Sequence, residues 1–233
     1  MLWGMKRVIM SWSSGKDSTW ALGVLLGDPS VEVIGLLTTV NQTHDRVAMH
    51  AVRTRLLRQQ AESLGLPLFV IDLPHPCTNE IYEDLMGRAL VQCLESGATH
   101  MAFGDLFLED IRAYREKNLE GTGLEPLFPI WQAPTAELAH KLVRPVEQGG
   151  VEAYLTCVDP RKVPASFAGR RYDQQLLADI EALPPGEEGP VDLCGENGEF
   201  HSLVVDAPSF SKRLEVELGE IVERDGFVFA DFQ

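Results

Sequence analysis

Short apolar runs alternate with amphipathic stretches along the first 130 residues of the chain. Residues 7–13 and 31–39 are rich in Val, Ile, Leu and Met, and the second run is almost continuous. Continuous β-branched runs are typical of strands that are buried on both faces of a parallel sheet. Runs at 67–73, 99–104 and 126–130 predict three further strands in the same way.

Between these runs the apolar positions recur three or four residues apart, which predicts helices. The clearest stretch is 47–64, which ends at Gly65 followed by Pro67. Helices are also predicted over 19–26, 79–96 and 109–119. Strands that alternate with helices imply right-handed crossovers and a doubly wound parallel sheet.

The regular alternation of predicted strands and helices ends after Trp131. Helices are predicted over 135–142 and 173–183, and strands over 152–158, 202–205 and 226–230. We therefore expect an α/β fold with a larger unit at residues 1–130 and a smaller α+β unit at 131–233.

The chain of 233 residues is acidic, with 20 Lys and Arg against 35 Asp and Glu and a net charge of −15. Nucleic acids and anionic membranes attract clustered basic residues, so we expect no direct contact with either. Residues 1–120 carry a net charge of −4 and residues 121–233 carry −11. The acidic half is therefore a candidate site for a cationic acceptor, or only a surface that maintains solubility.

No stretch approaches the ~18 apolar residues of a membrane span, and the N-terminus lacks the apolar core of a signal peptide. The four cysteines form no C-x-x-C pair, which argues against structural zinc and favours buried or half-buried thiols in a reducing compartment. We expect a cytoplasmic protein, and a homodimer only as the commonest state of such proteins.

The loop at residues 13–18 joins the first predicted strand to the first helix. It reads Ser13-Ser14-Gly15-Lys16-Asp17-Ser18. Small residues let a ligand approach the backbone, and the unpaired amides and the dipole of a helix start favour an anion such as phosphate. A Walker A loop is excluded, because Lys16 is followed by Asp17 and no glycine stands five places before Gly15.

Two further groups of polar residues lie near predicted strands. Gly104 and Asp105 end the fourth strand, and Arg112 follows about two helical turns later; alternatively Asp105 caps a helix and Arg112 lies in solvent. The stretch 195–202 reads GENGEFHS and places two carboxylates, an amide and an imidazole directly before a strand. On its own this stretch is equally typical of a hairpin turn.

The stretch SWSSGKDS (residues 11–18) resembles the S-G-G-x-D-S pyrophosphate loop (PP-loop) of ATP pyrophosphatases. With His50 and the blocks LLRQQAESLGLPL (56–68), FGDLFLEDIR (103–112) and CGENGEFHSLV (194–204), the chain resembles the diphthine-ammonia ligase family, which is adenine nucleotide alpha hydrolase-like. The resemblance spans nearly the whole chain. It implies a Rossmann-like ATP-binding domain at 1–130 and an acceptor-substrate domain at 131–233.

The resemblance also implies roles for individual residues. The β- and γ-phosphates of ATP would be held by Ser13, Gly15, Lys16, Asp17 and Ser18, with Ser14 in the place of a commoner glycine. Thr38 would lie beside adenosine, and Gly104, Asp105 and Arg112 would face the active site. Lys16 would offset charge on the departing pyrophosphate, and Asp17 would orient the loop or assist Mg²⁺.

The implied reaction is amide formation. A substrate carboxylate attacks the α-phosphorus of ATP and releases pyrophosphate, and ammonia then displaces AMP. Glu196, Asn197, Glu199 and His201 would form the acceptor side of the site. Glu196, Glu199 or His201 would accept the proton of the incoming ammonium, and the sequence leaves open which one does.

The acceptor in the resembling family is diphthine, a modified histidine on translation elongation factor 2. The compact chain also resembles bacterial members, and bacteria lack diphthamide, so an unidentified small carboxylate is the alternative. Another alternative is an adenine-nucleotide-binding regulatory protein without ligase activity. A tRNA-thiolating enzyme is disfavoured, because the chain has neither catalytic cysteine pairs nor a basic surface.

Overall fold

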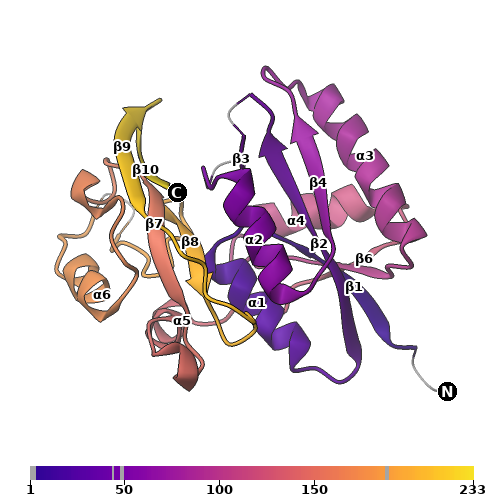
Figure 1. The fold of residues 1–233 in the computed structure, drawn as a ribbon, viewed down its shortest axis with the longest axis horizontal. Helices are drawn as coiled ribbons and strands as arrows, with labels where there is room; N and C mark the ends of the chain where they lie inside the picture. The colour runs from indigo at the N-terminus through magenta and orange to yellow at the C-terminus, as the bar shows by residue number, and fades with distance from the viewer. Residues whose placement is uncertain (1–3, 44, 48–49, 187–188) are drawn as a thin grey trace.

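The computed structural model of the chain describes residues 4–43, 45–47, 50–186 and 189–233. It contains two sheets, labelled A and B here, with helices packed around them (Figure 1). Within the described residues, no helix combines the length and the apolar character needed to cross a bilayer.

Sheet A is the parallel sheet that the sequence predicts. Its parallel strands are β1 (Lys6–Ser11), β2 (Val31–Asn41), β4 (Leu68–Leu73), β5 (His100–Ala102) and β6 (Glu125–Leu127). They lie in the order β4-β2-β1-β5-β6, so the strand order reverses at β1. Open α/β sheets bind ligands outside the carboxyl ends of their strands at such a reversal, which places the 13–18 loop at the expected position. The α/β, Rossmann-like fold is confirmed.

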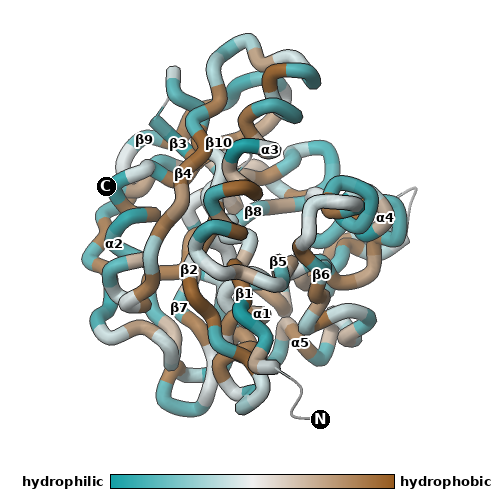
Figure 2. Tube along the Cα trace, turned by 90° about the vertical axis from the view of Figure 1, so that its right-hand side faces the viewer, coloured by the Kyte–Doolittle hydropathy of each residue, from teal (hydrophilic) through white to brown (hydrophobic). Residues whose placement is uncertain are grey.

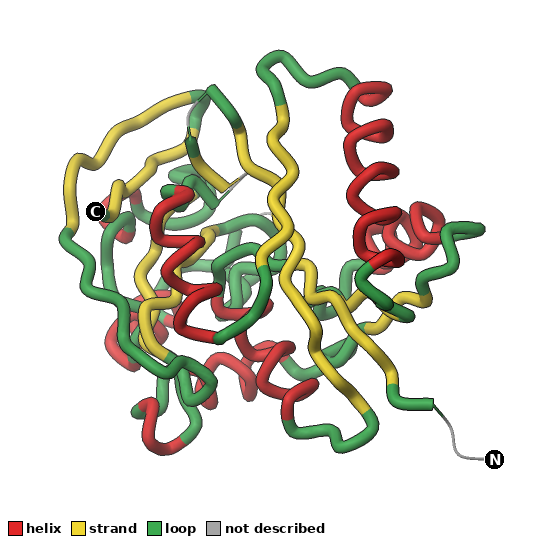
Figure 3. The backbone as a smooth tube through the Cα atoms, turned by 45° about the vertical axis from the view of Figure 1, so that its right-hand side comes forward, coloured by secondary structure: helices red, strands yellow, loops and turns green. Residues whose placement is uncertain are grey.

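Two pairs of helices cover the two faces of sheet A. The helices are α1 (Lys16–Leu26), α2 (Thr54–Leu64), α3 (Asn79–Glu95) and α4 (Glu109–Leu119). Helices α1 and α2 share a buried cluster with Val8 and Met10, whereas α3 and α4 share another with Ile9 of the same strand. Figure 3 shows α2 and α3 on opposite sides of the central strands. In Figure 2 the hydrophobic stretches follow these strands, and α4 is largely hydrophilic.

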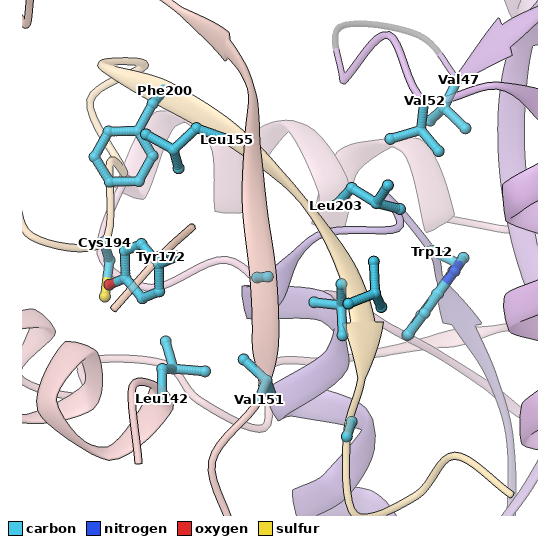
Figure 4. Close-up of a cluster of buried hydrophobic side chains, with 14 of the residues drawn as sticks. Trp12, Val47, Val52, Leu142, Val151, Leu155, Tyr172, Cys194, Phe200 and Leu203 are labelled. Carbon is cyan, nitrogen blue, oxygen red and sulfur yellow. The ribbon is translucent and has the colours of Figure 1, made fainter. Parts of the chain in front are cut away.

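Sheet B is antiparallel and belongs to the second half of the chain. Its strands are β7 (Glu152–Val158), β8 (Phe200–Asp206), β9 (Leu218–Arg224) and β10 (Phe227–Phe232), in the order β8-β7-β10-β9. Helices α5 (Thr135–Leu142) and α6 (Gln174–Glu181) and the short turns η1 (Val146–Gln148) and η2 (Ala165–Phe167) complete this unit. Its core is continuous with the α1–α2 side of sheet A, from Trp12 and Val52 to Leu203 and Tyr172 (Figure 4).

Three details differ from the predicted elements. The helix expected over 47–64 begins at Thr54, because Arg46–Val47 instead forms strand β3 against the end of β2 and Ala51 has a φ of 56°. Strand β9 was not predicted, since all seven of its residues are exposed and show no alternation. Cys77 is exposed rather than buried. The boundary near residue 130 stays a prediction.

The side chain of Gln60 links the two sheets. It is completely buried on α2, accepts a hydrogen bond from the Trp12 indole (2.9 Å) and donates to the carbonyls of Ser14 (3.1 Å) and Val204 (2.7 Å). Ser14 belongs to the β1–α1 loop and Val204 to β8. A single amide therefore satisfies buried polar groups from both halves of the chain.

We expect Gln60→Leu to lower the free energy of unfolding by about 2–4 kcal/mol, because it leaves the Trp12 N–H and the Val204 carbonyl buried without partners. Gln59→Leu is the matched control on the same helix, since Gln59 is exposed. It should change stability by less than about 0.5 kcal/mol. Urea unfolding measures both, and equal effects would contradict the role of Gln60.

Candidate active site

Strand β8 packs against the β1–α1 loop and holds its backbone through a hydrogen bond to Ser14. Ser14 has a φ of 69°, which favours glycine, and its side chain is fully buried. Its carbonyl accepts hydrogen bonds from the Val204 N–H (3.0 Å) and from Gln60. Ser14 therefore adopts the backbone that the commoner glycine would adopt, and these hydrogen bonds hold it there.

The start of helix α1 has no cap of its own, because Gly15 occupies the N-cap position. Ser202 of β8 supplies one, since its hydroxyl accepts a hydrogen bond from the Lys16 N–H (3.2 Å). On the other side, a Cβ on Gly104 would lie 3.0 Å from the backbone nitrogen of Ser18. Glycine at position 104 thus lets the end of β5 approach the first turn of α1.

Lys16 points inward and is only 2% exposed. Its Nζ donates to the carbonyl of Cys194 and to the Asp17 carboxylate, 2.8 Å from Oδ2. Burial is the largest single effect on Lys16 and opposes its charge, but Asp17, Cys194 and Glu196 together outweigh burial and hold the pKa of Lys16 above its ordinary value. Lys16 is therefore a fixed positive charge beneath the loop.

Three carboxylates lie near this charge: Asp17, Asp105 and Glu196. Burial raises the pKa of Glu196 to about 7, and Asp17 and Asp105 act in the same direction. The Leu106 N–H donates to Glu196 Oε1 (2.9 Å) and opposes this rise. Burial also raises the pKa of Asp105 above its ordinary value. Glu196 can thus take up or release a proton near neutral pH.

Two imidazoles lie beside the loop. The ring centroids of His50 and His201 are 4.5 Å apart, and Nδ1 of His50 is 3.4 Å from the Ser202 carbonyl oxygen. Burial lowers the pKa of His50 to about 4 and that of His201 to about 3. Both rings are therefore neutral at pH 7.

Two connected hollows open around these residues. The smaller, of about 230 Å³, is polar and is lined by the loop, Gly104, Asp105, Glu196 and His201. The larger, of about 620 Å³, lies between sheet A and helices α3 and α4 and is mostly apolar. Six residues line both hollows: Ser11, Ser13, His50, Phe103, Arg115 and His201.

Thr38 lines the larger hollow at the end of β2. It is 4% exposed, and among the described residues its Oγ1 has no hydrogen-bond partner. A buried hydroxyl without a partner is unfavourable unless a ligand supplies one. The larger hollow is thus an apolar cavity with an unused polar group at its strand edge, as in many small-molecule sites.

Comparison with known proteins identifies the family of the chain. The N-terminal domain of diphthamide synthase matches residues 5–126, and its C-terminal domain matches residues 139–230. The chain belongs to the diphthamide synthase family. It is 26% identical over 245 residues to the diphthine–ammonia ligase of Danio rerio, covering 96% of this chain and 91% of the relative. The diphthine–ammonia ligase of Homo sapiens is 24% identical over 242 residues, covering 96% and 88%.

Within this member of the family, the structure brings most of the predicted site residues together. The polar hollow is lined by Ser13, Lys16, Asp17, Ser18, Gly104, Asp105, Glu196 and His201. Gly15 lies beside it, since a Cβ there would be 3.1 Å from the His50 ring. Ser14 is buried within the loop and lines neither hollow.

Besides Ser14 and Gly15, three predicted residues line neither hollow. Arg112 pairs with Glu116 (2.8 Å), and its guanidinium lies 4.8 Å from the ring centroids of both Phe128 and Trp131. Asn197 is exposed. Glu199 is buried, and its Oε1 accepts from the Asp192 N–H (3.1 Å) and the Asn197 amide (3.3 Å). Its contacts hold the 192–199 turn that carries Glu196.

Arg115 and His50 line both hollows, at the junction between them, and neither is among the predicted ligands. Arg115 lies on the stripe of α4 formed by Ile111, Arg115 and Leu119, which faces the larger hollow. The i, i+4, i+8 spacing of this stripe was the available signal, and it turns Arg112 to another face. His50 lies inside the 47–64 stretch that the sequence predicts as helix, but in the structure it precedes α2, so the predicted helix face does not apply to it.

Proposed function

We propose that this protein is an ATP-dependent ligase that adenylates a substrate carboxylate and then transfers ammonia to it. The carboxylate oxygen forms a bond to the α-phosphorus, and the bond to the β-phosphate oxygen breaks to release pyrophosphate. Ammonia then attacks the acyl carbon, and AMP leaves. The observation that carries the proposal is the position of the β1–α1 loop, between a polar hollow beside Lys16 and an apolar hollow beside Thr38.

In this proposal ATP lies across both hollows. Adenosine occupies the apolar hollow, where the Thr38 hydroxyl can pair with a polar atom of the nucleoside. The β- and γ-phosphates lie over residues 13–18, at the start of α1, where backbone amides and the helix dipole favour an anion. The fixed charge of Lys16 stabilises the negative charge that develops on the departing pyrophosphate.

Mg²⁺ fits the polar hollow as a companion of ATP. Among the described residues no group of three His, Cys, Asp or Glu side chains is placed to hold a metal by itself. Mg²⁺ is usually bound by one or two carboxylates together with substrate phosphates. Asp17 would supply a carboxylate oxygen. Burial is the main cause of the raised pKa of Glu196, and the negative charges of Asp17 and Asp105 add to it, so a cation is favoured there. Bound Mg²⁺ would neutralise phosphate charge.

Glu196 is the group best suited to accept the proton of ammonium. Its pKa of about 7 matches a base that works near neutral pH, and it lines the polar hollow. His201, with a pKa of about 3, is too weak a base for this role. Glu199 lies outside the hollow, so we assign it and Asn197 to holding the turn.

The identity of the carboxylate acceptor is a separate part of the proposal. The curated relatives are named for diphthine and ammonia, so diphthine is the first acceptor to test. A small carboxylate is the second, and a regulatory role without ligase activity is the alternative. We retain a cytoplasmic location, no contact with nucleic acid and a homodimer as parts of the proposal.

The products of ATP cleavage test the reaction. The protein is incubated with ATP, Mg²⁺ and ammonium, together with diphthine-bearing elongation factor 2 or a panel of small carboxylates. We expect AMP and pyrophosphate in equal amounts, and Lys16→Met should lower the rate about 100-fold or more. Formation of ADP would contradict attack at the α-phosphorus. ATP binding without turnover for every acceptor would favour the regulatory alternative.

The pH dependence tests Glu196. At pH 7 we expect Glu196→Gln to lower the rate of amide formation about 100-fold, the loss typical of a missing general base. With total ammonium fixed, the deficit should shrink as pH rises, because free ammonia then needs no base. Glu199→Gln, a matched change outside the hollow, should keep the wild-type pH profile. A pH-independent deficit in Glu196→Gln would remove Glu196 from proton transfer.

A further inference from the structure

Arg115 places a guanidinium at the junction of the two hollows. It lines both of them from helix α4, and its guanidinium carbon lies 5.1 Å from the centroid of the Phe103 ring. Its Nε is 3.5 Å from Asp105 Oδ2, and within the described residues both atoms are buried without a hydrogen-bond partner. Asp105 and Phe103 therefore orient the guanidinium without using its full donor capacity.

The proposed reaction brings two anions to this junction. The triphosphate of ATP lies there beside Asp17, Asp105 and Glu196, so an incoming carboxylate meets strong negative charge. Lys16 lines only the polar hollow, where the proposal uses its charge for the departing pyrophosphate, so a second cation is needed for the carboxylate. Neutral imidazoles at His50 and His201 add no positive charge. Within the described residues, Arg115 is the only Lys or Arg that lines both hollows.

We propose that Arg115 binds the carboxylate of the acceptor and holds it against the α-phosphorus of ATP. The inference rests on the proposed function and adds a carboxylate subsite formed by Arg115, Phe103 and Asp105. A planar guanidinium can donate two parallel hydrogen bonds to a carboxylate, which fixes its orientation as well as offsetting its charge. When one carboxylate oxygen bonds to phosphorus and pyrophosphate leaves, the other remains as the acyl oxygen next to Arg115.

The test uses a stable mimic of the acyl-adenylate, 5′-O-(N-acetylsulfamoyl)adenosine, and AMP, which lacks the acyl group. Isothermal titration calorimetry measures both affinities in the wild type and in Arg115→Gln. We expect Arg115→Gln to weaken binding of the acyl mimic about tenfold or more, the effect of losing hydrogen bonds from a charged donor. Binding of AMP should weaken less than about twofold.

Two further variants separate the contact from charge and from folding. Lys117→Gln removes one positive charge from an exposed position of the same helix and should leave both affinities unchanged. Arg115→Lys keeps the charge but loses the planar fork, so it should recover only part of the affinity for the acyl mimic. If the ligand-free Arg115→Gln variant has the same thermal midpoint of unfolding as the ligand-free wild type, the variant is folded.

Three results would overturn the assignment of Arg115. Equal weakening of AMP and the acyl mimic would place Arg115 on the phosphate, and an effect on neither would place it outside the site. Wild-type protein that binds the acyl mimic no more tightly than AMP would show that there is no acyl subsite. The proposed function fails separately, if the products of ATP cleavage are ADP and phosphate.

Discussion

The carbonyl oxygen of Ser14 accepts hydrogen bonds from both halves of the protein, and the shape of the site depends on them. The Val204 N–H of sheet B and the Gln60 amide of helix α2 both donate to it, and they hold the loop in a backbone conformation that a serine rarely adopts. Ser202, two residues earlier on β8, caps the helix that follows. The loop therefore depends on the second half of the chain for its shape, and the continuous core around Trp12 and Leu203 keeps the two halves in place.

The charges around the loop follow from the same arrangement. Because β8 and the 192–199 turn enclose Lys16, its ammonium is held by Asp17 and the Cys194 carbonyl instead of by water. The same enclosure raises the pKa of Glu196 to about 7 and lowers those of His50 and His201. A fixed cation for phosphate, a carboxylate that titrates near neutrality and two neutral imidazoles are thus placed within one polar hollow. Such a set suits phosphoryl chemistry coupled to a proton transfer.

The sequence predicts the parts of this molecule that repeat a simple physical pattern. Buried runs such as 31–39 predict the parallel sheet, and the small residues before Lys16 predict a loop at its carboxyl edge, where the structure has residues 13–18; that this loop binds an anion stays a prediction. Strand β9 lacks the alternation that marks a half-buried strand, and β3 is only two residues long, so neither is visible in the sequence. At the site, the sequence does not distinguish Glu196 from Glu199. The conformation of the turn between them decides which one faces the hollow, and only the structure shows it. To find Arg115 from the sequence, one must know which face of α4 points to the larger hollow. Only the apolar stripe of α4 indicates that face.

The most direct test of this account is a crystal structure with α,β-methylene-ATP, which cannot be cleaved between the α- and β-phosphates, and Mg²⁺. We predict that the β- and γ-phosphates lie within hydrogen-bond distance of the backbone of residues 13–18, beside Ser202 of β8. Adenosine should lie in the larger hollow, in contact with Thr38. A triphosphate bound away from the loop, or an adenine outside the larger hollow, would contradict the account.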